Sequence, residues 1–474
     1  MTERLPKLAL MAGALFSLPI LVYLAYSRPG YFTSPVFLGG FLAAEALFLS
    51  AWLYRRIFLP VVLLAFLFAG VALPVGGFWS AGRWFFLALG AAIGSFILLR
   101  ERNHQFRLFH GWALLAIVAA LVSSAVSRYP GFALLKATSI LLLFLYAGTG
   151  ARLAASGRES RFVGGLVLGC EIFTGAMGLF YIGGIEAMGN PNSLGAVMSV
   201  CMVPVLLWAT LIDDTPTVHH RRLLLFGVAM YLVWHSRSRA GLLASFISCS
   251  LLCLCLRKYR LFAHGIVILL ILVTAAAIFD PDAFWATLRD TENTMVYKDR
   301  DAGLGVFASR QTPWQHATQS IRSHLWFGSG FGTTDNGVDA SAYLSKFSTI
   351  EGVTSENGSS YLSILSWVGV LGALPFALLL LLLVAKVLRT CFWMLNTASP
   401  YHIAIPLAMV TLAGLIHAGF EDWMFAPGYY VCVYFWAMAF ILADYAPWAP
   451  LPSFSHPWRP WGVRQQVGAA LPIR

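Results

Sequence analysis

Two arginines, Arg237 and Arg239, stand two positions apart in the short polar segment S-R-S-R-A-G between two apolar stretches. A planar guanidinium group binds phosphate oxygens through two parallel hydrogen bonds, so the pair is suited to a diphosphate. We therefore predict that Arg237 and Arg239 bind an anionic substrate group, with Arg239 also a catalytic residue that stabilises the leaving group. Contacts with lipid headgroups or loop carboxylates are the alternative.

A carboxylate that could act as a general base, Glu356, is followed by Asn357 where a long polar stretch returns to apolar sequence. Such a base would take a proton from an acceptor hydroxyl while the arginines hold the leaving diphosphate. We predict Glu356 as catalytic and Asn357 as a supporting residue. The alternative is that Glu356 only complements the positive end of a helix.

A third cation, Lys136, lies inside an apolar run, roughly 8 Å from the start of that run at Gly131. A charge in a bilayer is costly and usually functional, and we predict that Lys136 lines the same anionic site. The alternative is that its ammonium group reaches back to the membrane surface.

Four polar residues beside predicted spans are expected to support the site. Asn190 and Asn192 precede an apolar run, where they suit either a helix cap or an anion at a helix start. His417 and Glu421 are four residues apart, which would place them on one face of a continuing helix. Two carboxylates within spans, Glu45 and Glu171, either pair between helices or mark a pathway.

The composition indicates that these residues belong to a membrane protein. Of 474 residues, 59% are hydrophobic and only 11% are charged, against about 25% charged in soluble domains. This indicates an all-α polytopic membrane protein with about 12–14 transmembrane helices. The candidate spans are 8–26, 34–54, 59–75, 84–99, 109–126, 131–150, 162–183, 193–213, 222–236, 240–256, 261–279, 359–385, 400–419 and 424–443.

The distribution of charge predicts the orientation. With the N-terminus inside, 20 of the 32 lysines and arginines fall in inner segments and five in short outer loops. We expect both termini in the cytoplasm and one long loop, 280–358, outside. The net charge of +11 is then a topology signal, not an indication of nucleic-acid binding. No Cys/His spacing resembles a zinc site, and no metal or other cofactor is predicted.

Four segments in this order resemble the O-antigen ligase/Wzy O-antigen polymerase superfamily. They are N-P-N-S-L-G at 190–195, S-R-A-G-L-L-A at 238–244, W-Q-H-A-T-Q-S-I-R-S-H-L-W-F-G-S-G-F-G at 314–332, and E-N-G-S-S-Y-L-S-I-L-S-W-V-G-V-L-G at 356–372. The resemblance covers about 185–385. It divides the chain into 1–184 (N-terminal helices), 185–385 (the similar region), 386–446 (C-terminal helices) and 447–474 (a cytoplasmic tail).

The resemblance implies an inverting, metal-independent glycosyltransferase of the inner membrane. Its donor would be an undecaprenyl-diphosphate-linked oligosaccharide, its acceptor a glycan or lipid-linked glycan, and other envelope polysaccharide-assembly proteins are compatible partners. By resemblance, Arg239 matches the Ser-Arg arginine of the family. Arg310 lies near the family's loop arginine and is predicted to bind the diphosphate.

The chain departs from the family pattern at one position, where either Glu356 replaces the family histidine, or the base lies elsewhere, or the reaction differs. Ligases usually carry His-Asn, with the His as proposed base, where this chain has Glu356-Asn357. The Glu form is similar to exopolysaccharide-type members, so a repeat-unit polymerase is favoured over a ligase that attaches O-antigen to lipid A–core in lipopolysaccharide biosynthesis. A transporter or flippase of lipid-linked sugars, and a scaffold for envelope enzymes, are the alternatives of other classes.

Overall fold

The computed structural model describes residues 35–71, 76–100, 106–212, 215–279, 308–333 and 357–447, with 26, 30, 281–282 and 285–286. These residues are mostly helical and contain no strand. The first helices are α2 (Pro35–Gly70), α3 (Gly76–Arg100), α4 (Leu108–Ala125), α5 (Pro130–Tyr146), the π-helical η2 (Ala147–Ala151), α6 (Arg152–Ala155) and α7 (Glu159–Ile182). There follow α8 (Pro191–Ala196), the π-helical η3 (Val197–Met202), α9 (Val203–Ile212), α10 (Pro216–His235), α11 (Arg239–Cys255), α12 (Tyr259–Phe279), α14 (Ala308–Ser323), α16 (Ser360–Thr397), α17 (Ala404–Ala418) and α18 (Tyr430–Tyr445).

Among the described residues, six helical runs are long and apolar enough to cross a membrane, and three shorter apolar helices accompany them. The long runs are Gly82–Leu99, Leu108–Ala125, Pro130–Ala155, Glu159–Ile182, Pro191–Ile212 and Ser360–Thr397. The shorter ones are α11, α17 and α18. The predicted all-α polytopic membrane fold is confirmed, and the predicted span 8–26 lies outside the described residues.

One pair of predicted spans is joined in the structure. The spans expected at 34–54 and 59–75 form the single helix α2, which continues through Arg55 and Arg56 and contains Pro60. Arginine is a good helix former, so Arg55 and Arg56 do not interrupt the helix. Pro60, which has no backbone N–H to donate, follows them and also lies within the helix. A change of charge in the sequence therefore did not mark a helix end here.

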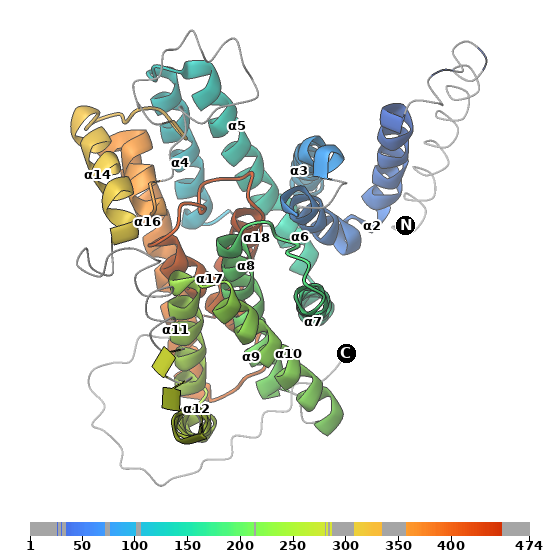
Figure 1. Cartoon of the computed structure of the whole chain (residues 1–474). Coiled ribbons are helices and arrows are strands. Elements are labelled where there is room, and N and C mark those ends of the chain that lie inside the picture. The colour runs from blue at the N-terminus through green and yellow to red at the C-terminus, as the bar shows by residue number, and fades with distance from the viewer. Residues whose placement is uncertain are drawn as a thin grey trace.

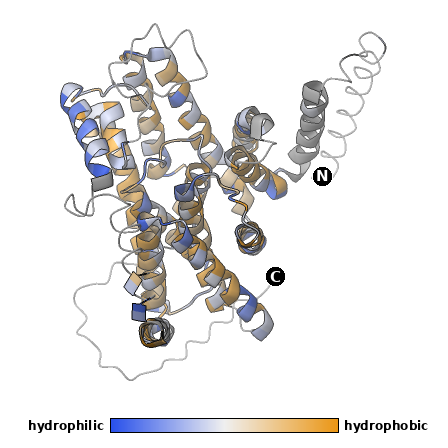
Figure 2. Ribbon diagram, in the orientation of Figure 1, coloured by the Kyte–Doolittle hydropathy of each residue, from blue (hydrophilic) through white to orange (hydrophobic). Residues whose placement is uncertain are grey.

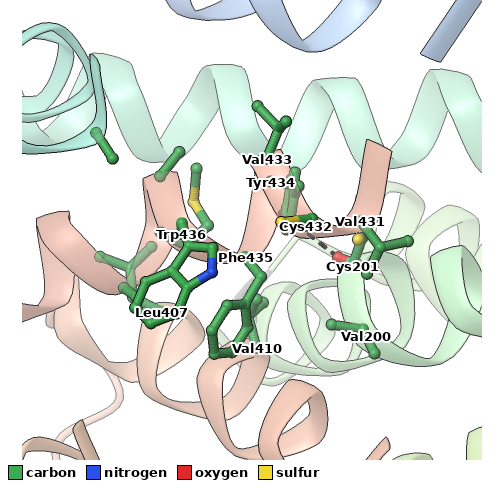
Figure 3. Close-up of a cluster of buried hydrophobic side chains, with 14 of the residues drawn as sticks. Val200, Cys201, Leu407, Val410, Val431, Cys432, Val433, Tyr434, Phe435 and Trp436 are labelled. Atoms are coloured by element: carbon green, nitrogen blue, oxygen red, sulfur yellow. Dashed lines mark hydrogen bonds between the residues drawn. The ribbon is translucent and has the colours of Figure 1, made fainter. Parts of the chain in front are cut away.

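The centre of the bundle is α18. Every residue from Tyr430 to Ala443 is buried, so this helix is apolar on all sides because other helices surround it. It contacts α17, η2 and η3, and Figure 3 shows its side chains meeting Val200 and Cys201 of η3 and Leu407 and Val410 of α17. The hydroxyl of Tyr434 donates to the carbonyl oxygen of Cys201 at 3.4 Å.

The helix of the predicted outer loop, α14, is largely hydrophilic and packs beside α16 (Figures 1 and 2). We expected it to begin at Thr312 as cap and Pro313 as first residue. It begins earlier, at Ala308, and Pro313 is its sixth residue, beyond the first four residues whose N–H groups have no partner within a helix. The predicted break is confirmed, since Gly328, Gly330 and Gly332 all have positive φ.

The segment after α14 docks onto a break in α16. Gly369 leaves the helical conformation at φ 66°, so neighbouring backbone groups of α16 need other partners. Ser329 N and Gly330 N donate to the carbonyls of Ser366 and Trp367, each at 3.0 Å, and Val370 N donates to the Leu325 carbonyl at 2.8 Å. Two of the four resemblance segments, 314–332 and 356–372, thus form one structural unit.

Candidate active site

The site is built around an ion pair between two segments far apart in the chain. The guanidinium group of Arg310, on α14, donates to the carboxylate of Glu421, in the segment after α17. Both side chains are only 16% exposed, so water screens the pair weakly. Arg239 lies close enough for the charges of Arg310 and Glu421 to act on it. The structure therefore brings two of the predicted phosphate ligands together.

Arg239 owes its position to a helix cap. It is the first residue of α11, and the side chain of the N-cap residue Ser238 accepts a hydrogen bond from Gly241 N at 3.1 Å. This cap fixes where α11 begins, and so fixes the point from which the Arg239 side chain leaves the backbone.

The residues around Glu421 also hold the start of α16. The carbonyl oxygen of Glu421 accepts from both N and Oγ of Ser360, at 3.2 and 2.7 Å. Ser360 Oγ in turn accepts from Trp423 N and Met424 N, each at 3.1 Å. One serine thus connects the first turn of α16 to the segment that bears the ion pair.

A second carboxylate, Asp422, connects to the same turn. Its Oδ2 accepts from Asn357 N at 3.3 Å and from Ser363 Oγ at 2.5 Å. Sequence reasoning missed Asp422. The signal was present in the adjacent acids Glu421-Asp422 at a predicted outer end, but only Glu421 was considered, because of its spacing from His417.

Asn357 is fully buried, and neither its Oδ1 nor its Nδ2 has a hydrogen-bond partner among the residues that the structure describes. A buried amide without partners is costly, and its presence needs a functional or structural reason. It directly follows Glu356, which lies outside the described residues. The predicted base is therefore attached by one peptide bond to the segment that Asp422 holds.

Lys136, on α5, reaches the same end of the bundle. Its ammonium lies 5.3 Å from the ring centre of Phe132, and the charges of Asp422 and Arg83 act on it. Its stem packs against Gly332, where a Cβ atom would come within 3.0 Å of Lys136 Cγ. The sequence did not single out Arg83, whose Nη1 donates to the Gly428 carbonyl at 2.8 Å.

The predicted His417–Glu421 pair on one helix face is wrong. The helix α17 ends at Ala418, so Glu421 leaves the helix and pairs with Arg310 instead. His417 is fully buried, and its Nδ1 accepts from Trp423 Nε1 at 2.9 Å. Its role in the structure is to hold the 419–424 segment.

The two arginines of the S-R-S-R segment lie in different surroundings. Arg237 lines a cavity of about 430 Å³ together with Asn190 and Asn192, whereas Arg239 adjoins Arg310 and Glu421. The predicted cap at the start of α8 is confirmed, since Asn190 Oδ1 accepts from Asn192 N at 2.9 Å.

Of the two carboxylates predicted within spans, Glu171 pairs between helices. Its oxygens accept from Arg221 Nη2 and Arg222 Nε of α10, each at 2.8 Å. This pairing accounts for Glu171 without a transport pathway. Glu45 lies in α2, and its side chain is outside the described residues.

Taken together, Arg239, Arg310 and Lys136 gather around Glu421 and Asp422 beside the start of α16, which gives three cations against two carboxylates among the described residues. Such an arrangement can bind an anion and stabilise negative charge on a leaving group. Among the described residues, no three His, Cys, Asp or Glu side chains are arranged to hold a metal ion.

Residues 223–377 match the family model of O-antigen ligases, a narrower range than the 185–385 over which the motifs were similar. No curated protein matches the chain. The matched range contains α11, α14 and the first part of α16, and so three of the elements that form the site. Over residues 223–377 the chain is therefore similar to the O-antigen ligase family.

Proposed function

We propose that the protein transfers a glycan from undecaprenyl diphosphate to a glycan hydroxyl, as a repeat-unit polymerase. The similarity to the O-antigen ligase family supports a membrane glycosyltransferase of the ligase/polymerase type. The observation that carries the finer proposal is the convergence of Arg239 and Arg310 beside Asn357, the neighbour of Glu356.

In the proposed reaction, Glu356 accepts the proton of the acceptor hydroxyl as the oxygen attacks the anomeric carbon of the donor sugar. The bond between that carbon and the diphosphate oxygen breaks, and its electron pair leaves with undecaprenyl diphosphate. Attack opposite the leaving group inverts the anomeric carbon. Arg239, Arg310 and Lys136 bind the diphosphate, whose negative charge grows as the bond breaks.

The contacts of the bundle are consistent with the predicted orientation. At one end they join segments predicted outside: Ser127 Oγ donates to the Ser329 carbonyl at 2.7 Å, and Arg310 pairs with Glu421. At the other end they join segments predicted inside, such as Arg257 Nη2 and the Leu395 carbonyl at 2.9 Å. We place the site at the periplasmic face of the inner membrane, with both termini in the cytoplasm.

The preference for a polymerase over a lipid A–core ligase rests on the Glu356-Asn357 pair in place of the family's His-Asn. The two activities leave different products when the gene is deleted. Single repeat units without polymer indicate a polymerase, and full-length polymer left on its lipid carrier indicates a ligase.

The test complements the deletion strain with single variants and compares the glycan on gels. Arg239→Ala and Glu356→Gln should fail to restore the polymer. Arg322→Ala removes an exposed arginine from the same helix as Arg310 and should restore it fully. Normal polymer with Arg239→Ala, at equal protein level in the membrane, would overturn the role given to Arg239.

A further inference from the structure

The cavity lined by Arg237 lies beside the site and is not used by the mechanism above. It occupies about 430 Å³ between the 183–190 segment, the start of α8 and the turn at Ser236–Arg237. This volume falls within the range of small-molecule pockets, about 300–1,000 Å³. Its polar lining consists of Tyr181, Glu186, Asn190, Asn192, His235 and Arg237.

The chemistry of this lining differs from that of the cationic site. One carboxylate, Glu186, offsets the one guanidinium group, Arg237, and two amides supply both donors and acceptors. The cap on α8 uses only Oδ1 of Asn190, which is compatible with donation from Nδ2 to a ligand. A set of mixed donors and acceptors with balanced charge suits a hydroxylated ligand better than a diphosphate.

An aromatic wall completes the cavity. The ring of His235 lies between two tyrosines: it is edge-on to Tyr181 at 5.5 Å and stacked with Tyr231 at 6.0 Å. These contacts fix the plane of the imidazole, and Tyr181 and His235 both line the cavity. Aromatic rings beside amides and a carboxylate offer an apolar surface to the C–H face of a sugar ring and polar groups to its hydroxyls.

The cavity and the cationic site are held at a fixed separation. Arg237 lines one and Arg239 belongs to the other, so their Cα atoms are at most about 7 Å apart along the chain. The turn between them packs against Gly195, where a Cβ atom would come within 2.4 Å of Ser238 Cβ and 2.6 Å of Ser236 Oγ. A glycan bound for reaction at Arg239 can therefore reach the cavity with its next sugar residues.

We infer that this cavity is a sugar-binding subsite, which holds a pyranose ring of the glycan through Glu186, Asn192 and His235. The inference rests on the proposed function for where the glycan comes from. The chemistry by which the cavity would bind a sugar does not depend on that function. An apolar cavity along α7 and α10 adjoins it at Ile182 and Tyr231, so a lipid headgroup is the competing occupant.

The test measures binding of free oligosaccharide to the purified protein in nanodiscs. The probe is the fluorescently labelled oligosaccharide that mild acid releases from the lipid-linked glycans of the producing strain, without lipid or diphosphate. The wild type should bind it, and Glu186→Gln and His235→Ala should each weaken binding about tenfold, the effect of losing one good polar contact. Arg239→Ala should bind it as the wild type does, because that residue belongs to the diphosphate site.

These outcomes separate the two proposals. Binding by a wild-type protein that transfers nothing would support the subsite while refuting the proposed function. Unchanged binding in both cavity variants, or no binding by the wild type, would overturn the subsite. Arg237-dependent retention of phosphatidylethanolamine or phosphatidylglycerol by the protein, with no oligosaccharide binding, would overturn it in favour of a lipid site.

Discussion

Two charged clusters lie at opposite ends of the helical bundle and differ in how their polar groups are arranged. The 421 cluster consists of Arg239, Arg310, Lys136, Asn357, Glu421 and Asp422. The 444 cluster consists of Arg107, Arg152, Lys386 and Asp444. Ser363, which bonds to Asp422, and Lys386 are separated by about 35 Å of the helix α16.

The 444 cluster closes the end of a helix. Arg152 binds both carboxylate oxygens of Asp444, and its Nη1 also donates to the Gly148 carbonyl at 3.1 Å. Lys386 and Arg107 donate to the last carbonyls of α18, at Ala443 and Asp444. Cations at the negative end of a helix, each bonded to a backbone or carboxylate oxygen, describe a structural site.

The 421 cluster uses the same residue types differently. Its members come from α5, α11, α14 and two connecting segments, and in the described part of the chain the buried amide of Asn357 has no hydrogen-bond partner. An Arg–carboxylate pair is therefore not informative by itself in this protein. What distinguishes the 421 cluster is the buried amide of Asn357, whose polar atoms have no hydrogen-bond partner among the described residues.

The largest expected effect on folding belongs to the 444 cluster. Arg152→Ala leaves Asp444 without its bidentate partner, and breaking such a buried pair costs about 3–5 kcal/mol. The thermal midpoint in detergent should fall strongly, while the folded fraction keeps its transfer activity per molecule. Lys258→Ala, an exposed cation at the start of α12, is the control. Loss of activity without loss of stability in Arg152→Ala would mean that the 444 cluster is also functional.

At the end of the bundle that holds the 421 cluster, a change in the docked 324–333 segment should lower both the stability of the protein and its transfer activity. A Cβ atom at Gly328 would lie 2.2 Å from the Trp367 carbonyl oxygen, and φ there is +74°. Gly328→Ala should therefore destabilise by about 1–3 kcal/mol through overpacking, and by roughly 1–2 kcal/mol more through the left-handed backbone. Both the thermal midpoint and the transfer activity should fall.

The matched control for that variant is Gly111→Ala on α4, near the 444 cluster. Nothing lies within 4 Å of a Cβ atom built there, and the backbone is helical. Its thermal midpoint should stay equal or rise, since alanine favours helix. A Gly328→Ala protein that matches this control would show that the docked segment does not support the site.

Asn357 should show opposite effects on stability and function. Asn357→Leu keeps the size of the side chain and removes two buried polar atoms without partners, which should stabilise by about 1–2 kcal/mol. If these atoms serve the substrate, transfer should fall at least about tenfold as the thermal midpoint rises. A lower midpoint would instead assign the amide a structural role.

The smallest effect is expected for Glu421→Gln. The amide keeps the size of the side chain and leaves the Glu421 carbonyl bonds to Ser360 unchanged, but it removes the charge beside Arg310. Transfer should change by about tenfold or less, in proportion to a single charge-assisted hydrogen bond. A loss as large as that of Arg239→Ala would make Glu421 a catalytic residue.

Most helices followed from hydrophobic runs, because a span must hide its backbone from lipid and needs a fixed length of apolar sequence. The predicted span 131–150 corresponds to Pro130–Ala155, and 162–183 to Glu159–Ile182. Failures came where a charge or proline was taken as a boundary, as at Arg55 and Thr312. Local sequence does not show whether backbone hydrogen bonding continues through such residues.

Site residues could be predicted where a polar or charged residue type interrupts apolar sequence. They could not be predicted where their role depends on the packing of distant segments. Lys136 stood out as a charge in an apolar run, and its proximity to Asp422 agrees with a polar site there. The pairing of Arg310 with Glu421 depends on how two segments 111 residues apart pack together. The different surroundings of Arg237 and Arg239 likewise depend on which other segments pack beside each of them. The spacing of residues along the sequence does not indicate which distant segments pack together.

We propose that Arg239 and Arg310 hold a diphosphate leaving group during glycan transfer. The most direct test gives purified protein in nanodiscs an undecaprenyl-diphosphate-linked oligosaccharide and measures released undecaprenyl diphosphate together with the glycan product. The wild type should release one undecaprenyl diphosphate for each glycosidic bond formed. Arg239→Ala and Arg310→Ala should each slow this release about 100-fold or more, whereas Arg322→Ala should leave it unchanged. No transfer by the folded wild type, or rates in Arg239→Ala and Arg310→Ala equal to that of the wild type, would contradict this proposal.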